Sequence, residues 1–260
     1  MGVGELLDGA FRIFRAHLAD FWIVGLICQA PVVMVAFPAP LAATAVSFLS
    51  YGLQVVAVLW LAARAILGEP LDRMASLGFA IRGVIPYFIG VVILMLAGLV
   101  AFVPVAIVAG VAGEAASIAL SLGLFPIALF VWVRLHPWRQ VLLLEREWSF
   151  VPRSFRLTNG SFWRIFAVTV LGLILVGIPA AIAQVSTLWA TEDLEQLTGD
   201  AIVSPPSAIL VGALVSALIQ PFGIILSTLL YYELRVRSEG YDMDLEADAF
   251  EAALQHEPRA

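Results

Sequence analysis

The longest uncharged stretches of the chain constrain its fold more than any other feature. Residues 21–63 contain no Asp, Glu, Lys or Arg, and residues 83–133 contain only Glu114. Residues 165–191 and 201–232 are equally free of charge. A helix needs about 20 apolar residues to cross a hydrocarbon core of ~30 Å. With 62% of its residues hydrophobic and 13% charged, against about 25% charged in soluble domains, the chain is predicted to be an all-α integral membrane protein.

Turn-forming sequences divide these stretches into six predicted spans. Pro38-Ala39-Pro40 interrupts the first stretch, residues 110–114 interrupt the second, and the acidic segment 191–200 separates the last two. We expect a polytopic helical bundle with six spans in three hairpins within a transmembrane domain of residues 1–238, followed by an acidic cytoplasmic tail at 239–260. The predicted spans are residues 21–37, 41–63, 84–109, 115–133, 165–190 and 207–232.

The basic residues predict the orientation of these spans. All 14 are arginines, and every one lies at the termini or in the loops that share their side of the membrane. The opposite loops contain acids but no basic residue. Because cytoplasmic loops are enriched in Lys and Arg, we expect both termini in the cytoplasm and a location in the plasma (inner) membrane.

An amphipathic helix is predicted before each hairpin. In residues 1–18, Leu6, Ala10 and Ile13 fall on one arc of a helical wheel, whereas Glu5 and Arg12 fall on the opposite arc. Comparable stretches precede the third span, at residues 69–82, and the fifth, at residues 151–164. We therefore expect interfacial helices. The three units could form an internal repeat, or could be alike only because each hairpin needs an interfacial lead-in.

Three glutamines are the main polar residues predicted to lie deep in the spans: Gln29, Gln54 and Gln220. Gln29 precedes Pro31 by two residues, and Gln220 directly precedes Pro221. Proline frees a backbone carbonyl that a neighbouring amide can satisfy. We interpret the glutamines as interhelical polar contacts. The alternative is a path for a polar substrate.

The sequence shows no pattern typical of catalysis. The spans lack ionisable residues away from their ends, which argues against proton relays and ion-coupled carriers. No HExxH, CxxC or GxSxG motif is present, and Cys28 is the single cysteine. Arg134, His136 and Glu145 form the only cluster that a membrane enzyme could use. We predict no catalytic, cofactor-binding or metal site, and no cofactor.

The arginines instead suggest contacts with lipid. Arginines beside apolar helix faces attract anionic head groups, and the absence of Lys argues against nucleic acid as a partner. The tail could also dock on this surface, because a helix from Asp244 would carry an apolar stripe with acids opposite. The candidates for head-group or tail docking are Arg12, Arg15, Arg73, Arg82, Arg153 and Arg156.

Three segments carry a resemblance to a known family. Residues 229–242, read LLYYELRVRSEGYD, resemble the ending of a family of uncharacterised bacterial membrane proteins named for the glycerophosphoryl diester phosphodiesterase membrane domain. Residues 4–12 and 154–164 are similar to its other recurring parts. The resemblance implies a multi-pass helical domain that is sometimes fused to a phosphodiesterase. It implies no catalytic residues here, since the phosphodiesterase needs a separate barrel of roughly 250 residues.

These observations favour a non-catalytic membrane module that organises lipids or partner proteins at the cytoplasmic face. The alternative is a transporter or channel for a neutral or lipid-like solute lined by Gln29, Gln54 and Gln220. The two hypotheses differ in whether the glutamines line a solvated cavity or bond to neighbouring helices.

Overall fold

The computed structural model describes residues 2–36, 38–198 and 206–240, and these residues form helices and no strands. The long helices are α2 (Leu18–Ala36), α3 (Pro40–Ile66), α4 (Arg73–Ala112), α5 (Glu114–Arg134), α8 (Phe162–Thr198) and α9 (Pro206–Glu239). Shorter ones are α1 (Val3–Ala16), α6 (Trp138–Gln140), the π-helix η1 (Val141–Glu145) and α7 (Phe150–Leu157). The all-α helical bundle predicted from the sequence is confirmed.

Six helical segments among the described residues are long and apolar enough to cross a membrane. Each includes at least part of one predicted span. Several helices continue past the predicted ends; α9, for example, runs to Glu239, the first residue of the predicted tail. The chain is therefore an integral membrane protein. The six segments are Leu18–Ala36, Ala45–Ile66, Arg73–Val100, Ile118–Glu145, Phe162–Ala183 and Ile209–Glu239.

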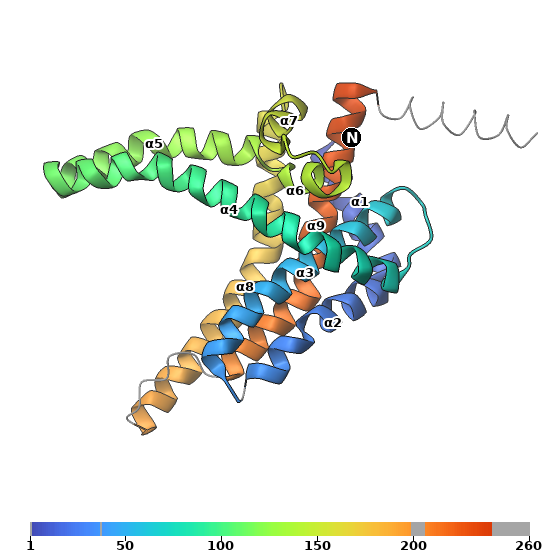
Figure 1. Ribbon diagram of the computed structural model, residues 1–260, viewed down its shortest axis with the longest axis horizontal. Coiled ribbons are helices and arrows are strands. Elements are labelled where there is room, and N and C mark those ends of the chain that lie inside the picture. The colour runs from blue at the N-terminus through green and yellow to red at the C-terminus, as the bar shows by residue number, and fades with distance from the viewer. Residues whose placement is uncertain (1, 37, 199–205, 241–260) are drawn as a thin grey trace, which may run out of the picture.

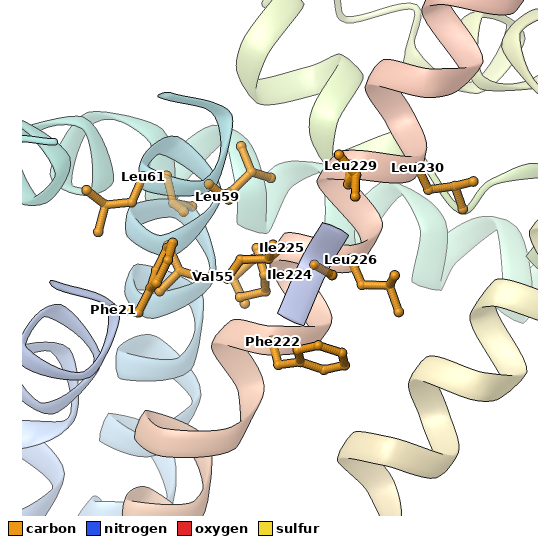
Figure 2. Close-up of a cluster of buried hydrophobic side chains, with 14 of the residues drawn as sticks. Phe21, Val55, Leu59, Leu61, Phe222, Ile224, Ile225, Leu226, Leu229 and Leu230 are labelled. Carbon is orange, nitrogen blue, oxygen red and sulfur yellow. The ribbon is translucent and has the colours of Figure 1, made fainter. Parts of the chain in front are cut away.

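The central core lies where α2, α3 and α9 pack together. Figure 2 shows the apolar side chains that gather between these helices, including Phe21 of α2, Leu59 of α3 and Ile225 of α9, which are fully buried. Gly25 allows α2 to approach α9, because a Cβ atom there would lie 2.6 Å from the carbonyl oxygen of Ala217. Small residues at helix crossings of this kind let backbones pack closely in a membrane.

The second hairpin is arranged differently from the other two. In Figure 1 the outer halves of α4 and α5 project away from α2, α3, α8 and α9, which lie together. The hairpin turns at Gly113, whose φ of 84° lies in the region that favours glycine. The apolar side chains on its outer part are exposed in the isolated chain, as expected of surface that faces lipid.

The predicted lead-in helices take two forms. Helix α1 is separate and packs on α9 through the buried side chains of Leu6 and Ala10, and α7 is also separate. The second lead-in is continuous with the span that follows, because α4 begins at Arg73 and continues past Gly83. Gly83 does not end the helix but permits close packing on α3, since a Cβ atom there would lie 2.7 Å from Val56 Cγ1.

Candidate functional site at the arginine-rich end

The three glutamines belong to one hydrogen-bond network that joins α2, α3 and α9. Gln29 Nε2 donates to Gln54 Oε1 at 2.6 Å, and Gln54 Nε2 donates to the carbonyl oxygen of Ser216 at 2.6 Å. The Ser216 hydroxyl donates to Gln220 Oε1 at 3.1 Å. Gln29 and Gln54 are buried, whereas Gln220 also lines a cavity of about 380 Å³. The glutamines thus connect helices, and one of them also faces a cavity.

Carbonyl groups of α9 in the turn before Pro221 accept side-chain hydrogen bonds from α2 and α3. Proline has no N–H, and its ring disturbs the preceding turn of the helix. Two carbonyl groups in that turn accept from neighbouring helices: Ser216 from Gln54 of α3, and Leu218 from Trp22 Nε1 of α2 at 3.1 Å. The neighbouring helices therefore supply donors around the disturbed turn, as expected where water is absent.

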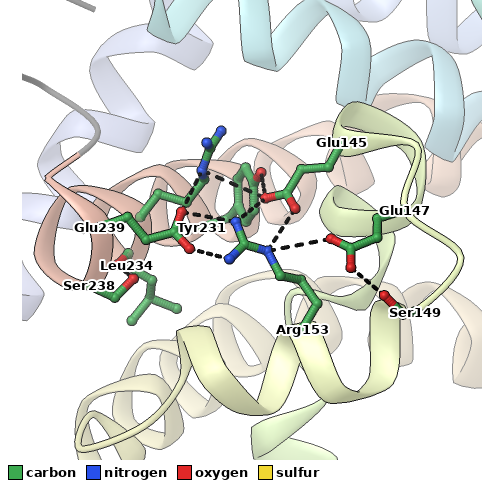
Figure 3. A network of polar contacts seen from close by, with 9 residues as sticks. Glu145, Glu147, Ser149, Arg153, Tyr231, Leu234, Ser238 and Glu239 are labelled. Atoms are coloured by element: carbon green, nitrogen blue, oxygen red, sulfur yellow. Dashed lines mark hydrogen bonds and ion pairs between the residues drawn. The ribbon is translucent and has the colours of Figure 1, made fainter. Parts of the chain in front are cut away.

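An ion-pair cluster around Arg153 connects α7, η1 and α9 at the end of the helices where the arginines gather, which we call the arginine-rich end. Figure 3 shows the Arg153 guanidinium between Glu145 of η1 and Glu239 of α9. Arg153 Nε donates to Glu145 Oε2 at 2.8 Å, and Nη2 donates to Glu239 Oε2 at 2.9 Å. The Tyr231 hydroxyl donates to Glu145 Oε1 at 2.6 Å. The hydrogen bonds with Glu145 and Glu239 raise the pKa of Arg153 above its ordinary value, and its charged guanidinium connects the three elements.

A second cluster joins α8 to α9. The carboxylate of Glu233, which is nearly buried, pairs with Arg164 of α8 and with Arg237 one turn further along α9 at 2.7 Å. Together with the Arg153 cluster, this places Tyr231, Glu233 and Glu239 in structural contacts. These residues lie within 229–240. That segment therefore fastens the end of α9 to its neighbours.

The sequence did not predict these two clusters, although it carried a partial signal. Glu233 and Arg237 are four residues apart, as are Arg235 and Glu239, which is the spacing of ion pairs on one helix face. The partners Glu145 and Arg164 lie on other elements, which spacing along the chain does not reveal.

Arg134, His136 and Glu145 do not form one group. The Arg134 guanidinium lies over the Phe155 ring at 5.3 Å, His136 Nδ1 lies 3.2 Å from the Thr169 hydroxyl, and Glu145 belongs to the Arg153 cluster. Within residues 2–36, 38–198 and 206–240, no group of three or more His, Cys, Asp and Glu side chains could hold a metal ion.

The six candidate arginines fall into two classes. Arg153 and Arg73 have acidic partners inside the chain, Arg73 through Asp20 at 2.6 Å. The other four are exposed, and no ion pair joins them to any described residue: Arg12, Arg15, Arg82 and Arg156. The predicted tail helix from Asp244 lies outside the described residues.

Arg82 lines the largest of the described cavities, with a volume of about 810 Å³, between α4 and the η1 segment. Arg146 reaches the same cavity, whose walls include Trp60, Phe79 and Trp148 and contain no Asp or Glu. Arg146 has a φ of 56°, the only positive value among described residues other than glycine. This left-handed conformation ends η1, and Arg146 lines the cavity while its neighbour Glu145 belongs to the Arg153 cluster. No sequence pattern indicated this position.

No family model, curated protein or solved structure matches this chain.

Proposed function

We propose that this chain is a non-catalytic membrane module that holds anionic lipids at the cytoplasmic face and organises partner proteins there. The observation that carries the proposal is the cavity of Arg82 and Arg146. It combines two arginines with aromatic side chains, and none of its lining residues is acidic. Lipid phosphates suit such a site, because guanidinium groups donate several hydrogen bonds to phosphate oxygens.

Two further features support a role in binding rather than in chemistry. The carboxylates of Glu145, Glu233 and Glu239 are engaged by arginines in contacts between helices. Arg12, Arg15 and Arg156 add exposed positive charge at the same end. Each such arginine contributes roughly 1 kcal/mol of attraction to an anionic surface. The resemblance of residues 229–242 agrees with this proposal, and we also propose that the chain is a bacterial member of that membrane-domain family.

The alternative, a transporter or channel, receives less support. Gln29 and Gln54 satisfy each other and Ser216 within the bundle, and only Gln220 lines one of the described cavities. A polar path along the glutamines would require these groups to face water instead of one another.

The test compares two double variants that remove the same charge. Full-length protein would be purified in detergent with equal amounts of phosphatidylglycerol and phosphatidylcholine, and retained lipids would be counted by native mass spectrometry. We expect Arg82→Gln with Arg146→Gln to lower phosphatidylglycerol retention about tenfold. Arg12→Gln with Arg15→Gln should cause a smaller loss, because these side chains line none of the described cavities. Equal retention by wild type and both variants would refute the proposal.

A further inference from the structure

A second lipid-sized space lies between the second hairpin and the rest of the bundle. Two cavities of about 680 Å³ and 380 Å³ share four lining residues, Trp132, His136, Arg139 and Thr169, and therefore adjoin. Sites for small molecules commonly occupy 300–1,000 Å³. The space is thus large enough for an elongated ligand, and its polar groups identify the class of that ligand.

Arg139 provides positive charge without an acidic partner. Its side chain is partly buried, and no ion pair connects it to another described residue. The residues lining the two cavities include no Asp or Glu. A partly buried cation without a counter-ion is costly, because desolvation weakens its contacts with water. An anionic ligand would remove this cost.

His136 provides an unused hydrogen-bonding atom beside Arg139. Its Nδ1 lies 3.2 Å from the Thr169 hydroxyl, whereas its Nε2 is buried and has no hydrogen-bond partner. When the Thr169 hydroxyl donates to Nδ1, the ring proton resides on Nε2. Nε2 is then a donor that lacks an acceptor. A phosphate oxygen would satisfy it together with Arg139.

The remainder of the larger cavity is apolar. Its walls include Leu94 and Phe102 of α4 and Leu124 and Ile127 of α5. Leu94, Phe102 and Leu124 lie well inside the sequence of the second hairpin, away from the arginine-rich end. The cavity therefore has a cationic end and a hydrocarbon-like end, which is the polarity of a lipid and not that of a free anion.

We propose that this cavity binds one anionic phospholipid, with phosphate oxygens at Arg139 and His136 Nε2 and an acyl chain between α4 and α5. The proposal rests on the proposed lipid-binding function and adds a second site of a different kind. The site at Arg82 and Arg146 lies between α4 and η1, whereas this one extends from α8 into the space between α4 and α5 and would enclose part of the acyl chain.

The first test removes the cationic end. Full-length Arg139→Gln would be compared with wild type for retained phosphatidylglycerol and phosphatidylcholine by native mass spectrometry. We expect a loss of one tightly held phosphatidylglycerol, with its affinity lowered about tenfold. Arg156→Gln removes the same charge from an exposed position that lines none of the described cavities. This control should keep the one tightly held phosphatidylglycerol and lose only part of the weak attraction to an anionic surface.

The second test fills the apolar end without changing charge. A Cβ atom at Gly98, which lines the larger cavity, would meet no atom within 4 Å, and the same holds for Gly110, which lies outside it. We expect Gly98→Trp to fold and to lose the same lipid, and Gly110→Trp to keep it.

Soluble glycerol 3-phosphate should not displace the lipid at concentrations near the lipid's own affinity, because it lacks the acyl chain.

Three outcomes would overturn the inference: unchanged retention in both Arg139→Gln and Gly98→Trp, unchanged retention in Gly98→Trp alone, or displacement by glycerol 3-phosphate at low concentration. The last two would indicate a site for a free phosphate.

If these variants retain lipid normally while Arg82→Gln with Arg146→Gln loses it, this inference fails and the proposed function stands. If no form of the protein prefers phosphatidylglycerol, the proposed function fails as well.

Discussion

Single side chains at the arginine-rich end have very different roles, although most of them are arginines. Arg153 pairs with three carboxylates, those of Glu145, Glu147 and Glu239, and has a side chain that is only 15% exposed. Arg156 lies one turn later on α7, is exposed and pairs with no described residue. Arg146 lines a cavity through its positive φ. Residue type therefore does not decide which arginines hold the fold and which can reach a ligand.

This difference predicts unequal effects of substitution on α7. Replacing Arg153 with Gln removes one of the two cations that Glu145 and Glu239 share, and leaves Arg235 as the other. An exposed ion pair stabilises a protein by about 0–1 kcal/mol, whereas breaking a buried one costs about 3–5 kcal/mol. For this partly buried pair we expect the free energy of unfolding to fall by about 2 kcal/mol.

Thermal denaturation of the detergent-solubilised protein would measure this effect. Arg156→Gln, on the same helix, is the matched control and should leave the melting temperature within about one degree, as surface substitutions usually do. Equal melting temperatures for the two variants would show that the Arg153 cluster does not stabilise α7 against α9.

At the scale of elements, close approach between helices decides how the bundle is assembled. Helices α2 and α9 meet at Gly25, where the neighbouring atom is backbone and cannot move aside as a side chain would. The carbonyl groups around Pro221 are satisfied by donors from α2 and α3 in the same region. Packing and hydrogen bonding therefore depend on each other at this crossing.

Gly25→Ala is expected to destabilise the protein by about 1–3 kcal/mol, because overpacking forces the helices apart. Gly98→Ala is the matched control, since a Cβ atom there meets nothing, and alanine favours a helix over glycine by roughly 1 kcal/mol. Melting temperatures should fall for the first variant and stay level or rise for the second. A fall of the same size in both would show that the crossing at Gly25 is not tightly packed.

For the whole molecule, the distribution of charge predicts the orientation in the membrane. A reporter fused after Ala260 should be active in the cytoplasm, and one inserted within residues 191–200 should be active only outside, because every arginine lies on the side of the termini. Paired fusions of an enzyme active only in the cytoplasm and one active only outside would measure both positions. A cytoplasmic signal from residues 191–200 would contradict the six-span topology.

The apolar stretches and their turns were enough to predict six helical spans, because the length of a membrane helix is set by the thickness of the bilayer. The positions of Gln29 and Gln220 beside helix-disturbing prolines likewise indicated contacts between helices. Each of these features depends on residues that are near one another along the chain.

Tertiary structure alone decided which arginines are free. Arg73 and Arg153 looked the same as Arg82 in the sequence, yet their partners Asp20 and Glu239 come from elements 53 and 86 residues away. Likewise, Arg139 and His136 line one cavity together with Thr169 because α8, which carries Thr169, packs beside them. The sequence determined the spans because hydrophobicity and helix length are local properties, whereas the pairing of charges and the shape of cavities depend on which distant helices pack side by side.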